Sequence, residues 1–190
     1  MSIEDTFGRV VHDVRKMGSF CVFVGRLGPM QLGHQFQVRI LAEGFPGRHL
    51  LALGSCSHSI SHRHMFNYAD RSDFVRAIYP HVRIIGIPDS DNNDDVMWFR
   101  FLDDYIRAAG GDPQDTVFLG GSEGDVEFYE GTGRKVYIVN RFDGTTTKIS
   151  AEEVRDALIH GRSLDGMLDP RLIPIVQERF TLRYHELRRT

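Results

Sequence analysis

Cysteines and long apolar runs are scarce in this sequence, and each shortage excludes a class of protein. Only Cys21 and Cys56 occur, so a disulfide framework is not indicated and a reducing, cytoplasmic location is expected. No apolar run approaches the roughly 20 residues that cross a bilayer. The first 19 residues lack the apolar core of a signal peptide, so we expect no membrane segment and no secretion signal.

An excess of positive charge is also missing. The 190 residues carry a net charge of -3 at pH 7, so no basic field indicates nucleic acid or an anionic membrane as a partner. Hydrophobic residues make up 41% and charged residues 26% of the chain, which is ordinary for a globular protein. The length suits one domain, with a helix in 1–17, a core in 19–160 and a helical segment in 165–190.

Short apolar stretches alternate with segments of helical periodicity along the chain. Strands are predicted at 20–24, 49–55, 82–88, 116–121 and 135–140. Helices are predicted after Ser2 and at 34–44, 69–79, 95–109, 122–130, 150–161 and 171–188. Short, continuously apolar strands between helices are typical of a sheet buried on both faces. The pattern therefore predicts an α/β fold with a doubly wound, Rossmann-like, parallel five-stranded sheet and extra helices at both ends.

Ligands of such sheets bind outside the carboxyl ends of the strands, at a topological switch point. Four polar or glycine-rich loops follow predicted strands, at 25–34, 54–67, 88–95 and 119–124. We therefore expect these loops to gather along one edge and to form the ligand site.

The stretch GRLGPMQLGH at 25–34 lies between a predicted strand and a predicted helix. Gly25 and Gly33 permit close approach of the backbone to a phosphate, and a helix that begins near Gly33 offers free N–H groups and a positive dipole end. His34 either donates to a phosphate oxygen or is a satisfied structural histidine. Arg26 is either a phosphate clamp or a surface arginine.

The same stretch resembles the first motif of the HxGH nucleotidylyltransferase superfamily, and most of all the archaeal-type nicotinamide mononucleotide (NMN) adenylyltransferases. Against the family pattern GRxQPxHxGH, the matching residues are Gly25, Arg26, Pro29, Gly33 and His34. Gly28 stands where the family has Gln, and Gln31 stands where it has the first His.

Three further stretches resemble the family in order and spacing. Residues 54–71 are similar to its loop with Gly-Ser, Ser, Arg, Phe and Glu-Arg, and the matching residues are Ser55, Ser59, Arg63, Phe66 and Arg71. Residues 87–98 resemble the segment whose Asn and Trp contact the nicotinamide end, so Asn93 and Trp98 take those positions. Residues 149–155 are similar to the ISxTxxR motif through Ser150 and Arg155, while Glu152 replaces the usual Thr.

The resemblance implies attack of the NMN phosphate on the α-phosphate of ATP, which gives NAD and pyrophosphate. In such a reaction the protein aligns two anions and neutralises charge, and it needs no nucleophile of its own. Magnesium is expected on the ATP phosphates from the chemistry rather than from a motif. The resemblance implies a catalytic set of Gln31, His34, Arg26 and Arg63. It implies a nucleotide-binding set of Gly25, Arg26, Gly33, His34, Gly120, Ser150 and Arg155. It implies a substrate-binding set of Ser55, Ser59, Arg63, Phe66, Asn93 and Trp98.

Gln31 separates the possible functions. Its amide can donate a neutral hydrogen bond but carries no charge, and loss of a charged donor at a developing negative charge costs on the order of 100–1000-fold in rate. Three hypotheses follow: an NMN adenylyltransferase, a nucleotidylyltransferase with another acceptor, and a nucleotide-binding protein with weak or lost catalysis. Association into a homo-oligomer is expected by analogy with enzymes of this kind.

No metal site within the protein is predicted. Cys56, His58, His62 and His64 do not have a standard zinc spacing. The acidic run at 89–95 lacks the glycine and the closing glutamate of a calcium loop, and a solvated acidic loop is expected there. Trp98, the single tryptophan, either stacks on nicotinamide or anchors its helix in the core.

Overall fold

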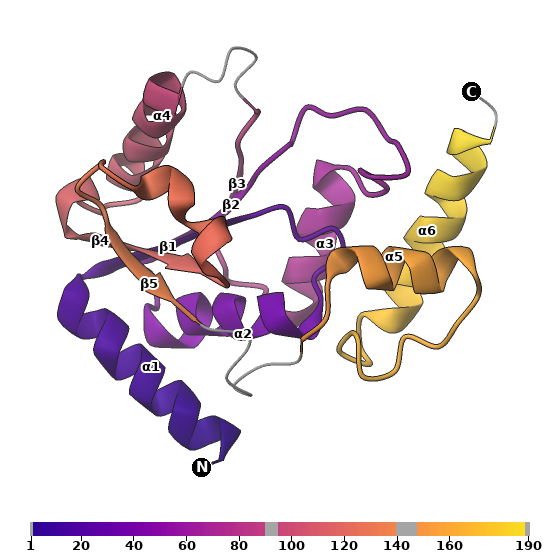
Figure 1. Cartoon of the computed structure of the whole chain (residues 1–190), viewed down its shortest axis with the longest axis horizontal. Helices are drawn as coiled ribbons and strands as arrows, with labels where there is room; N and C mark the ends of the chain where they lie inside the picture. Colours follow the sequence, from indigo (N-terminus) through magenta and orange to yellow (C-terminus); the bar gives the residue numbers. More distant parts are fainter. Residues whose placement is uncertain (1, 90–94, 140–147, 189–190) are drawn as a thin grey trace.

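A computed structural model describes residues 2–89, 95–139 and 148–188 as one parallel sheet with helices against both faces (Figure 1). Its strands are β1 (Phe20–Gly25), β2 (His49–Leu53), β3 (Ile84–Gly86), β4 (Thr116–Gly120) and β5 (Lys135–Ile138). Their order across the sheet is β3-β2-β1-β4-β5, and all neighbouring pairs are parallel. The predicted doubly wound, Rossmann-like fold is confirmed.

The α-helices are α1 (Ile3–Met17), α2 (Leu32–Arg39), α3 (Tyr68–Ile78), α4 (Asp95–Ala108), α5 (Ala151–Ile159) and α6 (Ile173–Leu187). A π-helical turn, η1 (Ile40–Gly44), extends α2, and a 3₁₀ turn, η2 (Pro113–Asp115), precedes β4. Ser2 caps α1 through a capping box with Asp5, as the sequence predicts. None of the helices in the described part of the chain is long and apolar enough to cross a bilayer.

One predicted helix is wrong. The segment 122–130 forms two 3₁₀ turns, η3 (Glu123–Asp125) and η4 (Glu127–Tyr129), in place of one α-helix. No side chain caps either turn, and Gly124 lowers the helix propensity of a segment that is already short. The predicted helix at 34–44 also begins earlier, at Leu32, because Gln31 caps it.

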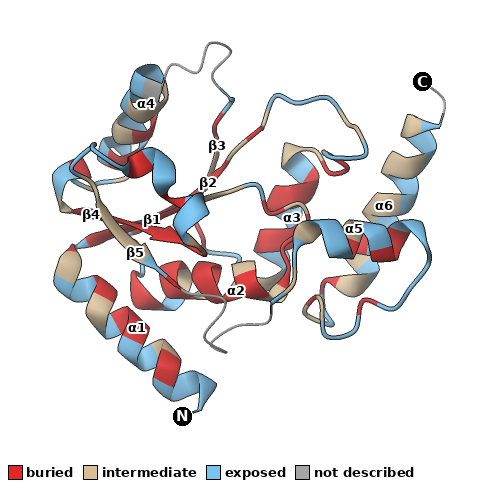
Figure 2. Cartoon of the chain, viewed as in Figure 1, coloured by how far each residue is buried: buried red, intermediate tan, exposed pale blue. Residues whose placement is uncertain are grey.

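The two faces of the sheet build two separate cores. Alternate strand residues such as Phe23 and Leu51 pack against α1, α2, α3, α5 and α6, whereas Val22 and Leu50 pack against α4 and η4. Figure 1 shows α4 on the opposite side of the sheet from α1 and α2. Figure 2 shows buried residues along β1 and β2 and exposed residues on the outer turns of α1, α4 and α6.

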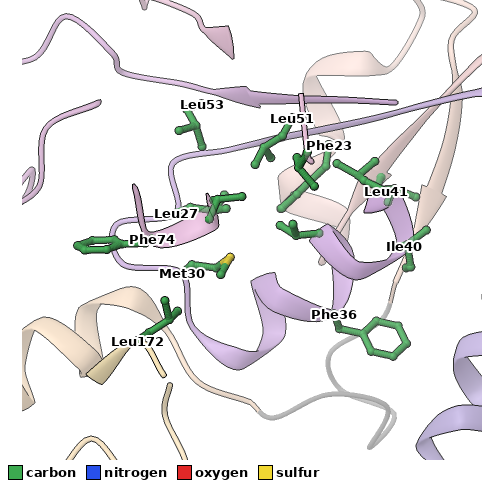
Figure 3. Packing of buried hydrophobic residues seen from close by; sticks show 14 of the residues in the cluster. Phe23, Leu27, Met30, Phe36, Ile40, Leu41, Leu51, Leu53, Phe74 and Leu172 are labelled. Carbon is green, nitrogen blue, oxygen red and sulfur yellow. The ribbon is translucent and has the colours of Figure 1, made fainter. Parts of the chain in front are cut away.

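The loop that follows β1 is anchored by the first of these cores. Leu27 and Met30 are almost fully buried, and Figure 3 shows them among the packed side chains of that cluster, as it does Leu172 from the C-terminal segment. Gly25 is required at the start of the loop, because a Cβ there would lie 2.7 Å from Cδ1 of Leu27. Core packing therefore fixes a loop whose intervening residues, Arg26 and Gly28, face away from the core.

The C-terminal helix is tied to α3 by a buried ion pair. The Asp70 side chain is only 2% exposed, and its two oxygens accept hydrogen bonds from Nε and Nη2 of Arg183 at 2.8 and 3.1 Å. Asp70 also completes a capping box with Asn67 at the start of α3. A single carboxylate therefore joins the first turn of α3 to α6.

We expect Asp70→Asn to lower the free energy of unfolding by about 2 kcal/mol, because it removes the buried charge that pairs with Arg183 and leaves only the half-exposed Glu186 as its partner. Urea denaturation followed by circular dichroism measures this change. The control is Asp73→Asn, whose carboxylate is 49% exposed and lies 3.5 Å from Arg179. That change should cost less than about 1 kcal/mol, and equal costs for the two variants would contradict the prediction.

Candidate functional site

The carboxyl ends of the strands open onto one cavity of about 1270 Å³. Loops after β1, β2 and β3 line it, together with residues of α4 and the first turns of α5. The predicted site residues that line it are Gly25, Arg26, Gln31, His34, Ser55, Arg63, Phe66, Trp98, Ser150 and Arg155. Residues far apart in sequence therefore meet at the switch point that the fold predicts.

Three other predicted site residues, Gly33, Ser59 and Gly120, do not line this cavity. Gly33 is buried in the first turn of α2, and Ser59 is exposed on the loop at 54–67. Gly120 ends β4, where a Cβ would collide with Val126, so packing accounts for this glycine. Asn93 lies outside the described residues.

The expectation of free N–H groups at the start of α2 is wrong. The Gln31 side chain caps this helix, and its Oε1 accepts hydrogen bonds from the N–H groups of Gly33 and His34. Leu32 donates to the backbone oxygen of Met167 at 3.1 Å, and the fourth helical N–H donates to the backbone oxygen of Gln31 at 3.0 Å. The N–H groups of the first three helical residues are therefore occupied, and an anion must be held here by side chains.

The other end of the Gln31 amide is available to a ligand. The residue is fully buried and lines the cavity, and within the described residues its Nε2 has no hydrogen-bond partner. A buried amide N–H₂ group without a partner costs free energy that a bound acceptor would recover. Gln31 thus has two functions in one side chain, a helix cap at its oxygen and a donor at its nitrogen.

Three arginines converge on the cavity from different elements. Arg26 follows β1 and Arg63 lies on the loop after β2, and neither forms an ion pair with any carboxylate in residues 2–89, 95–139 or 148–188. Arg155 of α5 is half-buried and donates from Nη1 to the Gly28 oxygen at 2.9 Å. Burial lowers the pKa of Arg155, and repulsion from Arg26 and Arg63 adds to this effect, although Glu152 opposes it. Convergent positive charge of this kind is complementary to a polyanion.

A polar chain borders the same cavity on the side of β2 and β3. Ser55 Oγ donates to Asp89 Oδ1 at 3.1 Å, and Asp89 also pairs with Nε2 of His58. The His58 ring stacks on the His64 ring with centroids 4.4 Å apart. Although burial alone would raise the pKa of Asp89, the hydrogen bonds from Ser55 and His58 hold it below its usual range. Asp89 is therefore an anchored residue of the cavity wall with a half-exposed side chain, as expected for a solvated loop, and residues 90–94 of the acidic run lie outside the described residues.

Aromatic rings form another part of the cavity wall. Trp98 of α4 and Phe128 of η4 meet edge to face, with ring centroids 5.4 Å apart, and both line the cavity. Trp98 also packs against the core under α4, so it anchors this helix, and its contact with nicotinamide stays a prediction. Phe66 is 3% exposed and packs edge to face on Phe74, so most of its ring belongs to the core.

Ser150 is the N-cap of α5. Its Oγ accepts a hydrogen bond from the Glu153 N–H at 3.1 Å, and the Glu153 carboxylate accepts one from the Ser150 N–H at 2.6 Å. This capping box fixes where α5 begins. It therefore also fixes the position of Arg155 relative to the cavity.

Asp89 and Arg71 are the cavity residues whose roles the sequence does not reveal. Asp89 lies two residues after the buried Ile87 that follows β3, and this position was the available signal. Arg71 matches a position of the family motif. The backbone oxygens that it contacts lie on the loops after two different strands, so its role depends on how the chain folds. Within the described ranges, no group of three or more His, Cys, Asp or Glu side chains could hold a metal ion.

The structure thus defines a class: α/β proteins with a doubly wound parallel sheet and a polar cavity at the carboxyl ends of its strands. No family model matches the sequence, and no curated protein matches it. A solved structure of a bifunctional NMN adenylyltransferase/ADP ribose pyrophosphatase from Francisella tularensis, complexed with AMP and a Mn ion, aligns with 90% of this chain at a TM-score of 0.64 and 18% identity. A second structure of this bifunctional protein aligns with 90% of the chain at a TM-score of 0.61 and 16% identity. The chain spans 52% and 55% of these two structures, and the similarity shows a shared fold.

The stability of the free protein should depend on pH through His64. Burial lowers the pKa of His64 from 6.5, and His58, Arg26 and Arg63 lower it further, while Asp89 opposes them. A lowered pKa means that folding favours the neutral ring, so this stability is present above pH 6.5 and is lost as the pH falls through the lowered value.

We therefore expect wild type to lose more unfolding free energy than His64→Asn between about pH 7.5 and about pH 5, where histidines titrate. Urea denaturation at each pH measures the two slopes. Replacement of the exposed His81 controls for loss of any one histidine. Equal slopes for wild type and His64→Asn would show that this ring does not contribute.

Proposed function

We propose that the protein is a nucleotidylyltransferase that transfers AMP from magnesium-bound ATP to NMN, with NAD and pyrophosphate as products. The observation that carries the proposal is the convergence of Arg26, Arg63 and Arg155 with the buried Gln31 amide on one cavity. Polyphosphate is a ligand that such a set of donors fits. The family-like motifs at 25–34, 54–71 and 149–155 contribute these residues in the same order along the chain.

Each group has a role in this proposal. Arg155 and Ser150 bind the ATP phosphates from α5, and Arg26 and Arg63 clamp the phosphates from the side of β1 and β2. Gln31 and His34 contact the α-phosphate that is transferred. Gly25 gives the backbone room at the end of β1, whereas Gly33 and Gly120 act through helix and strand packing.

The acceptor is assigned to the other half of the cavity. Trp98 faces the nicotinamide ring, with Phe66 and Ser55 beside the ribose and phosphate. Ser59 and Asn93 remain predicted contacts that depend on the loops around them. The magnesium ion enters with ATP, because the described residues offer no cluster of carboxylates for a resident metal.

The proposed reaction requires that the protein align NMN with ATP and neutralise the charge of their phosphates. An oxygen of the NMN phosphate forms a new bond to the α-phosphorus of ATP, and the bond from that phosphorus to the bridging oxygen of the β-phosphate breaks. Pyrophosphate leaves with the electron pair of the broken bond. No proton transfer is required, so cations and neutral donors suffice as catalytic groups.

A second function has a specific observation in its favour. Gln31 supplies no positive charge, and all backbone donors at the start of α2 are occupied, so charge stabilisation at the transferred phosphate is weak. A nucleotide-binding protein with little or no turnover would share the same cavity. We propose a cytoplasmic location and self-association for the protein under both functions.

Purified protein with NMN, ATP and Mg²⁺ should form NAD and pyrophosphate, which liquid chromatography and a phosphate-release assay measure. Nicotinic acid mononucleotide and flavin mononucleotide in place of NMN test the identity of the acceptor. Product from another acceptor alone would move the protein to a different branch of the superfamily. Tight binding of ATP or NAD by calorimetry without any product would support the binding protein and reject the enzyme.

The two roles of Gln31 can be separated by substitution. Gln31→Glu keeps an oxygen to cap α2 but replaces the amide donor by a negative charge, so the rate should fall by about 100-fold or more. The cap of α2 is retained, so circular dichroism should still show the helix content of wild type, although the buried carboxylate lowers the unfolding free energy. Gln31→Ala loses both roles and should lower rate and stability together. A wild-type rate in Gln31→Glu would show that the Gln31 nitrogen takes no part in catalysis.

A further inference from the structure

Two non-glycine residues in the described ranges adopt the left-handed backbone conformation. Leu27 has a φ of 47° and Ser55 a φ of 53°. Such angles are uncommon for residues with a side chain and persist where the surroundings hold them. Each residue lies in the loop just after one of two paired strands, β1 and β2, and both line the cavity.

One guanidinium holds both of these turns. Nη1 of Arg71 donates to the Arg26 oxygen and to the Gly54 oxygen, each at 2.7 Å, and Nη2 donates to the Ser55 oxygen at 3.0 Å. The first two carbonyls belong to the peptides that enter Leu27 and Ser55. Arg71 therefore fixes the backbone at both left-handed residues and ties the two loops to each other.

The charge of Arg71 is buried without a carboxylate. The residue is 4% exposed, and no ion pair joins it to an acid in the part of the chain that the structure describes. Burial lowers the pKa of Arg71, but a guanidinium stays protonated in proteins. A buried charge is tolerated when hydrogen bonds satisfy it, and here backbone oxygens do so.

The backbone of Arg71 is itself rigidly placed. It stands in the first turn of α3, next to Asp70, whose carboxylate is bound by Arg183 of α6. Nε of Arg71 also donates to the Asn67 oxygen at 3.3 Å, within the same turn. The fixed first turn of α3 therefore holds the Arg71 guanidinium in place against both loops.

We propose that Arg71 is a positioning residue for the anion site: it sets the separation of Arg26, on the loop after β1, from the loop after β2 that carries Arg63. The link to catalysis rests on the proposed function, because polyphosphate must meet both arginines at once. Misplacement of catalytic groups by about 1 Å can cost on the order of 100-fold in rate. A lysine at this position keeps the charge but lacks the planar fork that reaches three carbonyls.

The test is a double-mutant cycle between Arg71→Lys and Arg26→Ala, with inorganic pyrophosphate as the probe. Because Trp98 is the single tryptophan and lines the cavity, its fluorescence reports binding without turnover. Arg71→Lys should weaken pyrophosphate binding by about tenfold or more, and it should have almost no further effect once Arg26 is Ala. Additive effects of the two substitutions would overturn the proposal.

Arg39→Lys is the matched control for lost stability. Arg39 is an ion-paired arginine at the end of α2 that donates to the Glu4 carboxylate of α1 and does not line the cavity, so its replacement should lower the melting temperature without changing pyrophosphate affinity. If Arg39→Lys weakened binding as much as Arg71→Lys at equal loss of stability, Arg71 would be an ordinary structural residue.

The cycle also separates this proposal from the proposed function. Coupled binding effects in a protein that forms no NAD would retain Arg71 as a positioning residue and reject the enzyme. NAD formation together with additive binding effects would retain the enzyme and reject Arg71 as a positioning residue. Failure of wild type to bind pyrophosphate would overturn both.

Discussion

Parallel pairing of β1 with both β2 and β4 is the constraint on which the rest of the structure depends. Parallel neighbours need crossover connections, so helices must cover the sheet and all strands must end at the same edge. The chain crosses one face on leaving β1 and the other on its way to β4, which leaves a hollow above their carboxyl ends. Every group assigned to the anion site reaches that hollow from a loop or from the first turns of a helix.

The polar side chains of the site form two sets: those that bind backbone atoms of the protein and those that remain for a ligand. The Gly33 and His34 N–H groups at the start of α2 donate to Gln31, and three backbone oxygens of two loops accept from Arg71. Arg26 and Arg63 are left without carboxylate partners among the described residues, and the Gln31 amide nitrogen is left buried and unpaired. The groups that hold the loops in place are thus different from the groups that remain for a ligand.

The sequence predicts the fold well because apolar periodicity and strand length are local properties. Short apolar runs between helices suffice to indicate a parallel sheet, and capping residues such as Ser2 and Ser150 mark helix starts. The helix predicted at 122–130 is wrong because Gly124 and the packing of this segment against β4 favour short turns over an α-helix. The loops at the cavity could be assigned to one edge, but their contacts could not, since Arg71 bonds to carbonyls 45, 17 and 16 residues away in sequence. The cap formed by Gln31 was hidden for a related reason: Gln is not among the preferred N-cap residues.

An amide in the place of an imidazole also changes how the site responds to acidity. The Gln31 side chain has no proton to gain or lose from about pH 5 to about pH 9, so its cap and its donor persist unchanged over that range. An imidazole at the same position could accept from the helix only while neutral. Protonation of His64 in the cavity wall therefore leaves the cap of α2 unchanged.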